Sequence, residues 1–237
     1  MTATPRTVEQ TNFDAIAGIY DDVFPPHIIE HYLRRRASYV LRHAAAQDQS
    51  ALDVGAGTGL LAERLSDLGL GVVALDPFPQ MLGQLRQRRP EIETVVAHGD
   101  DIPFPDDVFD LTYSVAVMHH IAEPPLVRRT LAEMVRVTRP GGRILIWDHN
   151  PLNPYWSLLM RRVPQDTGTE RLVPLRELVA GLREARADIV RTERLGLMPE
   201  FVPRRLLGAA AVVERTVEAT PSLRRFCAHN VVLAIKT

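Results

Sequence analysis

Short apolar runs alternate with amphipathic stretches along the chain from residue 51 onward. In the amphipathic stretches the apolar residues recur with the period of one helix face. The short runs are apolar at nearly every position, which is typical of parallel strands covered on both faces. The alternation indicates an α/β fold with right-handed crossovers. The pattern predicts helices at 60–68, 79–88 and 125–137, between strands at 51–54, 71–75, 94–97, 111–115 and 143–147.

The two ends of the chain depart from this alternation. Residues 13–46 have a helical pattern that breaks at Pro25-Pro26, where proline removes backbone donors. After residue 148 the pattern predicts two helical pieces within 152–184, a strand at 189–197, a helix at 201–218 and a final strand at 230–235. We therefore expect a leader at 1–9, a helical cap over 1–48 and one α/β domain over 49–237, with helical insertions at about 152–184 and 198–225 that cap a substrate.

Three glycines follow the first predicted strand. The sequence from Ala51 to Leu60 reads Ala-Leu-Asp-Val-Gly-Ala-Gly-Thr-Gly-Leu, with glycine at Gly55, Gly57 and Gly59. Glycine lets the backbone turn sharply and lets a ligand lie against it. The helix that follows presents free backbone N–H groups to a polar ligand. The loop therefore predicts a nucleoside-type cofactor at the end of the first strand.

Composition narrows the class of protein. The 237 residues have a formal net charge of −1, which gives no basic face for nucleic acid. The single cysteine, Cys227, excludes an internal disulfide framework and fits a reducing compartment. The first residues lack the apolar run of a signal peptide, and no apolar stretch approaches about 20 residues. We expect a cytoplasmic protein without a transmembrane segment.

Two kinds of cofactor loop compete for the glycines. A dinucleotide fingerprint needs G-x-G-x-x-G, whereas here Leu60 stands where the third glycine of that fingerprint belongs. An acidic residue, Asp53, also precedes the loop. The stretch D-V-G-A-G-T-G resembles the first motif of class I S-adenosylmethionine-dependent methyltransferases. Further segments resemble that family in the same order, over about residues 13–150: a strand ending at Asp76, then 97–110, 115–121 and 139–143.

The resemblance implies a Rossmann-like sheet of seven mostly parallel strands with a reversed last strand, which 230–235 fits. It also implies S-adenosylmethionine as cofactor and S-adenosylhomocysteine as product. A gapless match places His98 at the adenine amino group, whereas a gapped match places Asp100 there. The residues that the resemblance assigns to the cofactor are Tyr20, Asp53, Gly55, Gly57, Asp76, Pro77, Met81, Gly99, Asp100 and Asp101.

Methyl transfer is an in-line displacement that needs an aligned nucleophile and, where the nucleophile carries a proton, a base. The candidate bases are His149 and His119, which follow predicted strands at the ligand-binding edge of the sheet. His27 and His31 share one helix face and are candidates for contacts with the substrate. A structural role is the alternative for all of them. The pair His119-His120 has no third ligand at a recognisable spacing, so we expect no metal ion.

The acceptor is the least defined part of the prediction. We expect methylation at oxygen or carbon of a small molecule and no nucleic-acid partner, since the chain lacks the Asn/Asp-Pro-Pro-Tyr/Phe signature. The apolar segment 198–225 with its arginines predicts a cap for an apolar or lipid-like acceptor, peripheral contact with a membrane, or an ordinary packing helix. Two alternatives remain: a nicotinamide-dependent oxidoreductase and a non-catalytic protein that binds S-adenosylmethionine.

Overall fold

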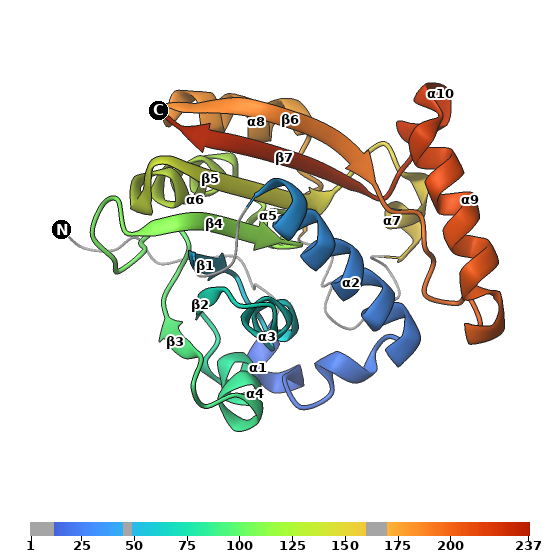
Figure 1. The fold of residues 1–237 in the computed structure, drawn as a ribbon, viewed down its shortest axis with the longest axis horizontal. Helices are drawn as coiled ribbons and strands as arrows, with labels where there is room; N and C mark the ends of the chain where they lie inside the picture. Colours follow the sequence, from blue (N-terminus) through green and yellow to red (C-terminus); the bar gives the residue numbers. More distant parts are fainter. Residues whose placement is uncertain (1–11, 45–48, 160–169) are drawn as a thin grey trace.

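The computed structural model describes residues 12–44, 49–159 and 170–237, so the expected leader at 1–9 and part of the insertion at 152–184 lie outside the described residues. The centre of the fold is a seven-stranded sheet with the strand order β3-β2-β1-β4-β5-β7-β6 (Figure 1). The strands are β1 (Ser50–Val54), β2 (Gly71–Asp76), β3 (Glu93–Val96), β4 (Phe109–Val115), β5 (Thr138–His149), β6 (Ala187–Leu195) and β7 (His229–Lys236).

The direction of the strands places the site. Every pair from β3 across to β5 is parallel, whereas β7 is antiparallel to both β5 and β6. The predicted seven-stranded sheet with a reversed last strand is therefore confirmed. The strand order changes direction between β1 and β4, and in open α/β sheets ligands bind outside the carboxyl ends of the strands at such a point.

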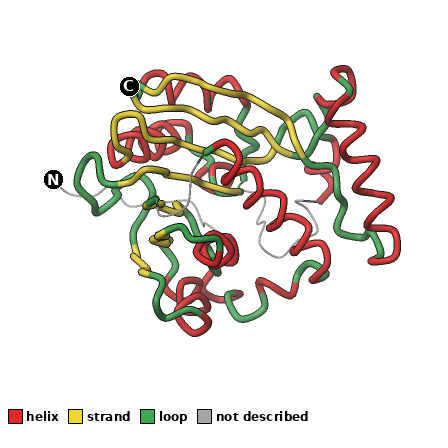
Figure 2. Tube along the Cα trace, viewed as in Figure 1, coloured by secondary structure: helices red, strands yellow, loops and turns green. Residues whose placement is uncertain are grey.

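Helices pack on both faces of the sheet (Figure 2). Strand β5 shows why both faces are covered, because successive side chains of a strand point to opposite faces. Leu145 and Trp147 are buried in one core cluster, and Ile144 and Ile146 in the other. The first cluster contains side chains of α2 (Pro26–His43), α3 (Leu60–Asp67) and α4 (Pro79–Arg88), and the second those of α6 (Pro124–Val137) and α8 (Leu175–Glu184).

The remaining helices are short, with one exception. Figure 1 shows α7 and α9 beyond the arrowheads of β4 and β5, which are the carboxyl ends of these strands. These helices are α1 (Phe13–Ile16), η1 (Tyr20–Asp22), α5 (Met118–Ile121), α7 (Pro154–Leu159), η2 (Arg204–Leu206), α9 (Leu207–Ala219) and α10 (Pro221–Arg224). Among the described residues no helix is long and apolar enough to cross a bilayer.

One predicted boundary is wrong. The pattern predicts a strand that begins at residue 143, yet β5 begins at Thr138. Thr138 pairs with Phe109 and Arg143 with Leu111, so the extra residues of β5 form an irregularity in the ladder. Gly141 has a φ of +77°, which lets the chain bend there. Pairing on both sides of the bend keeps this segment in the strand.

Buried charges join α2 to α9. The His31 imidazole donates a hydrogen bond to Glu214 (2.8 Å), and Arg35 forms ion pairs with Glu214 and Glu218. The other oxygen of Glu214 accepts the backbone N–H of Leu197 (2.8 Å). Burial alone would raise the pKa of Glu214, but the His31 hydrogen bond and the Arg35 charge lower it to about 2. A lowered carboxyl pKa stabilises the fold at neutral pH, and this contribution is lost only as the pH falls toward that value.

The glycine loop provides a stability test. Gly59 has a φ of +78°, and a Cβ built there lies 2.6 Å from Leu85 Cδ2 and 2.9 Å from Leu85 Cβ. Gly59→Ala combines an unfavourable backbone conformation with overpacking, so we expect it to lower the free energy of unfolding by about 2 kcal/mol or more. Urea denaturation monitored by circular dichroism measures the change.

Gly83 in the middle of α4 is the matched control, because a Cβ there meets no atom within 4 Å. Gly83→Ala should raise the free energy of unfolding by about 0.5–1 kcal/mol, since it removes freedom from the unfolded chain. Equal effects of the two substitutions would contradict the packing argument.

Candidate active site

The loop after β1 is held across the end of β2. The backbone N–H groups of Gly55 and Ala56 donate to the carbonyl oxygen of Leu75 (2.8 and 3.0 Å). Gly55 has a φ of +79°, and a Cβ there would meet Val117 Cγ2 at 2.4 Å. Gly57 has a φ of +58° and lines both cavities of the site. Glycine is therefore needed at position 55 to make room for Val117, and at position 57 it leaves the backbone open to a ligand.

Asp76 ends β2 beside this loop. Its two carboxylate oxygens accept the backbone N–H groups of Phe78 (2.9 Å) and Gly57 (2.8 Å). Burial raises the pKa of Asp76 to about 6, although both amides act in the opposite direction. Each oxygen keeps a lone pair that can accept a ligand hydroxyl, which is the arrangement that a ribose needs.

A cavity of about 130 Å³ lies beside Asp76. Most of the residues that the sequence assigns to the nucleoside are in its wall, but Asp101 is exposed and is not among the lining residues. Both candidates for the adenine amino group line this cavity, so the structure keeps that choice open. The lining residues on which the prediction bears are Tyr20, Asp76, Pro77, Met81, His98, Gly99 and Asp100.

A second cavity of about 910 Å³ adjoins the first. The two share five wall residues, so a ligand in the small cavity can extend into the large one. Asp53, His119 and His149 line only the large cavity. The shared residues are Tyr20, Gly55, Gly57, Ala116 and His120.

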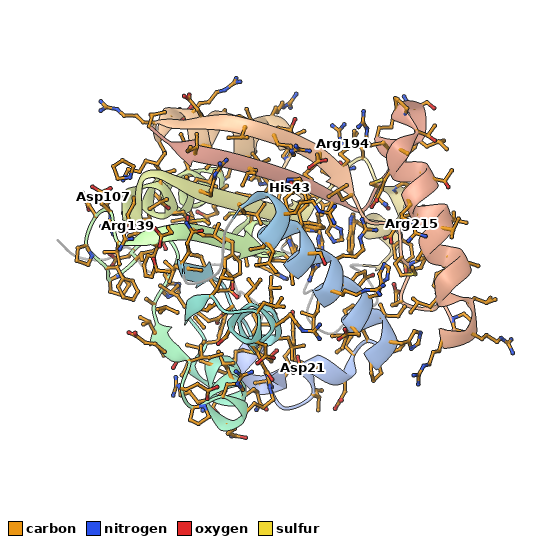
Figure 3. All side chains as sticks on the ribbon, in the orientation of Figure 1. Asp21, His43, Asp107, Arg139, Arg194 and Arg215 are labelled. Carbon is orange, nitrogen blue, oxygen red and sulfur yellow. The ribbon has the colours of Figure 1, made fainter. Side chains whose placement is uncertain are left out.

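The N-terminal segment covers the small cavity. The Phe13 ring packs against Tyr20, Phe78 and His120 at centroid distances of 6.1, 5.2 and 5.0 Å. The Thr58 hydroxyl of the glycine loop donates to Asp21 (2.6 Å), which ties this segment to the loop. Figure 3 shows Asp21 between α2 and the α1 region.

Arg36 is a cavity residue that the sequence analysis missed. It lines the large cavity, and within the described part of the chain its guanidinium makes no hydrogen bond, although it stands 5.4 Å from the Tyr32 ring centroid. Burial lowers the pKa of Arg36, but a guanidinium remains charged at neutral pH. Its spacing from Tyr32 is one helical turn, and this shared face is the sequence signal that could have identified it.

Asp53 lies in the same wall. Burial raises the pKa of Asp53 to about 8, and the nearby carboxylate of Asp76 adds to the rise, while Tyr113 and Arg36 oppose it. At neutral pH the carboxyl group is therefore mostly protonated. Arg36 and Asp53 together offer one end of the cavity a cation and a titratable acid, which suits the carboxylate and ammonium of an amino acid.

An aspartate–histidine pair faces the large cavity. The Nδ1–H of His119 donates to Asp148 Oδ1 (2.9 Å), and Asp148 Oδ2 accepts the backbone N–H groups of Val117 (3.1 Å) and Met118. Burial would raise the pKa of Asp148, but the hydrogen bond from His119 and those from the backbone amides lower it. With Nδ1–H committed to Asp148, His119 keeps Nε2 as a hydrogen-bond acceptor. The pair is organised as a base.

Asp148 was not among the predicted site residues. Its sequence signal is the same as that of Asp76, an acidic residue at the end of a buried strand. The fold brings Asp148 of β5 next to His119 of α5.

His149, the other candidate base, is held in an aromatic stack. Its ring lies 4.0 Å from the His119 ring and 3.6 Å from the Trp156 ring, at interplanar angles of 15° and 8°. Its Nδ1 is buried without a hydrogen bond from the described residues. Burial lowers the pKa of His149 far below its usual range, so the ring is neutral. His149 is therefore a neutral ring stacked against His119 and Trp156, without an oriented proton.

The fold brings three residues that could bind a metal ion close together. Ligand atoms of His119, Asp148 and His149 lie within 4.8 Å of one another. However, both Asp148 oxygens already accept hydrogen bonds, and two stacked imidazole rings do not direct their lone pairs at one point. This arrangement favours a base over a metal site.

The two histidines proposed as substrate contacts lie elsewhere. His27 bonds to the carbonyl oxygen of Val202 (2.7 Å), and His31 bonds to Glu214. Neither lines the large cavity. Both hold α2 against the segment around α9, because that segment supplies their acceptors.

Comparison with known proteins agrees with this geometry. A family profile described as a methyltransferase domain matches residues 52–146. The demethylmenaquinone methyltransferase of Renibacterium salmoninarum is 35% identical over 164 residues, which cover 64% of this chain and 68% of that protein. An uncharacterized methyltransferase of Mycobacterium tuberculosis is 36% identical over 152 residues, which cover 62% of this chain and 56% of that protein.

A solved structure agrees in fold. A SAM-dependent methyltransferase from Thermotoga maritima superposes with a TM-score of 0.69 at 17% identity, over 95% of this chain and 98% of that one. The dinucleotide-dependent alternative finds no support in these similarities. The matched segment contains the glycine loop, Asp76 and the histidine pair. The chain therefore belongs to the S-adenosylmethionine-dependent methyltransferases, and S-adenosylmethionine is its cofactor.

Proposed function

We propose that the chain transfers the methyl group of S-adenosylmethionine to an oxygen or carbon of a small apolar acceptor in the large cavity, with His119 as general base. The observation that carries the proposal is the Asp148–His119 pair in the wall of a cavity that adjoins the cofactor cavity. A base at this position can take the proton that a hydroxyl acceptor loses as it attacks.

The cofactor site fits an amino-acid nucleoside. Asp76 would accept hydrogen bonds from the ribose hydroxyls, and the small cavity would hold the adenine ring. Arg36 would pair with the cofactor carboxylate, because it is a half-buried cation in the cavity wall without a hydrogen-bond partner among the described residues. When bound, S-adenosylmethionine supplies an electrophilic methyl carbon on a sulfonium. The walls of the large cavity would hold the acceptor in line with that carbon.

The walls of the large cavity indicate the class of acceptor. Seven of its side chains are aromatic, and such walls suit a flat or apolar molecule. The relative from Renibacterium salmoninarum is named for demethylmenaquinone as its acceptor, which supports an apolar acceptor here. The seven aromatic residues are Tyr20, Phe24, Tyr32, Tyr155, Trp156, Phe201 and Phe226.

His119 would take the hydroxyl proton on Nε2. Bound S-adenosylmethionine would supply its methyl group to this oxygen, or to the adjacent carbon of an aromatic enolate, and would leave as S-adenosylhomocysteine; a methylated ring carbon would then release its own proton. Asp148 would orient the imidazole and stabilise the imidazolium that results. We also propose a cytoplasmic location, for which the single thiol of Cys227 is suited.

Arg36 tests the cofactor site. Arg36→Ala should weaken S-adenosylhomocysteine binding about tenfold or more, because a charged partner in a buried site is removed, and Arg36→Lys should recover part of the loss. Calorimetric titration measures both, with NAD as the comparison ligand and Asp76→Ala as a second variant. Arg34→Ala is the matched control, since Arg34 is exposed on the same helix. Equal affinities of the Arg36 and Arg34 variants would rule out the assignment.

Asp53 predicts a pH dependence of cofactor binding. The free protein carries a proton on Asp53 below its pKa of about 8, and a cofactor ammonium nearby favours the ionised carboxylate. Binding at pH 7 should therefore release a proton, and the affinity should rise with pH until about 8. Calorimetry in two buffers with different ionisation enthalpies measures the release. Asp53→Asn should reduce it, and an unchanged release in this variant would assign the proton to another group.

His119 tests the chemistry. His119→Gln should reduce turnover about a hundredfold or more and leave S-adenosylhomocysteine affinity within about twofold, because it removes the base and not the cofactor site. His149→Phe is the control, since it keeps a flat ring in the stack and should retain most activity. Turnover is followed as S-adenosylhomocysteine release with demethylmenaquinone or a shorter-chain analogue.

The opposite ranking of these variants would move the base to His149, and full activity of both would remove histidine from the mechanism. Cofactor binding without transfer to any hydroxylated aromatic acceptor would favour the alternative of a non-catalytic protein that binds S-adenosylmethionine.

A further inference from the structure

One surface of the molecule is unusually apolar. Residues 201–226, which contain η2, α9 and α10, form what we call the α9 surface. Six large hydrophobic side chains on it are between 40% and 72% exposed, whereas the rest of the described chain contributes four such side chains. The six are Phe201, Leu206, Val212, Val213, Leu223 and Phe226.

The exposed charged side chains of the α9 surface are all positive. Glu214 is 2% exposed and Glu218 is 12% exposed, because both turn inward to Arg35. The exposed face of α9 therefore carries small and apolar residues with Arg215 (labelled on α9 in Figure 3). Every other exposed charge of this surface is also an arginine: Arg204, Arg205, Arg224 and Arg225.

The large cavity reaches this surface. Phe201, Val213 and Phe226 line the cavity and are also exposed. An apolar molecule that leaves the cavity past these side chains therefore meets the apolar part of the α9 surface before it meets water.

We propose that the α9 surface docks onto an anionic lipid bilayer, from which the apolar acceptor enters the cavity. Apolar side chains surrounded by arginines match the boundary between acyl chains and negative headgroups. An acidic protein would match the arginines but leaves the exposed valines, leucines and phenylalanines unexplained. The entry of the acceptor rests on the proposed function, whereas the docking itself does not.

Vesicle flotation tests the docking. The full chain should bind vesicles of phosphatidylcholine and phosphatidylglycerol, bind pure phosphatidylcholine vesicles weakly, and lose binding at high salt. The double variant Arg205→Glu/Arg215→Glu should lower partitioning about tenfold or more, since each arginine near an anionic surface contributes to binding. Val212→Asp should also lower it, because it places a charge in the apolar face.

Matched controls lie elsewhere on the surface. Arg176→Glu/Arg183→Glu makes the same charge change on α8, and Val190→Asp makes the same apolar-to-acid change on β6, at exposed positions. Neither should alter partitioning by more than about twofold. Circular dichroism and S-adenosylhomocysteine affinity, measured on every variant, show that each variant is folded.

The outcomes separate the two proposals. No binding of the unmodified chain to anionic vesicles, or equal losses in the α9 and control variants, overturns the docking. Self-association that Val212→Asp abolishes, without vesicle binding, assigns the surface to a second copy of the chain. Vesicle binding that follows the α9 variants supports the docking, even where the chain transfers no methyl group.

Discussion

Carboxylates buried at one edge of the sheet constrain the rest of this structure. Asp53, Asp76 and Asp148 lie at or next to the ends of β1, β2 and β5 and are all buried. A buried carboxylate is costly unless N–H groups or cations surround it. The loops after the strands supply those groups, with Gly57 for Asp76 and Val117 for Asp148. Because the same loops form the cavity walls, satisfying the carboxylates also shapes the site.

The three carboxylates are not satisfied equally. Asp148 receives enough donors to hold its pKa below the usual range, whereas burial raises the pKa of Asp53 and Asp76. An aspartate in the first condition can orient a histidine and remain charged. Carboxyl groups in the second condition gain when a ligand brings hydroxyl or ammonium donors. One edge of the sheet therefore carries Asp148, whose charge is already stabilised, and two carboxyl groups whose ionised forms a bound ligand would stabilise.

Local signals explain what could be predicted. The cofactor loop is one continuous stretch, and its glycines adopt positive φ angles that other residues rarely adopt. Asp76 is the last residue of a strand. Both features can therefore be identified from the sequence. Asp148 was missed because its importance depends on His119, 29 residues earlier in the chain, and Arg36 because only the folded structure shows that its side chain lines the cavity. His31 shows the reverse case, since a histidine on the expected helix face turned out to bond to Glu214 of α9. Helix periodicity shows which side chains lie on the same face, but it does not show which residues that face contacts.

Different parts of the chain border the two cavities of the site. Phe13 lines the small cavity from the N-terminal segment, whereas Phe201 and Phe226 line the large cavity from the C-terminal part. Ion pairs tie α2 to α9, so the wall that α9 contributes to the large cavity is fixed to the helix that carries Arg36. No residue of 201–226 lines the small cavity. The sequence of this segment can therefore change, and with it the acceptor, while the walls that hold the nucleoside stay the same.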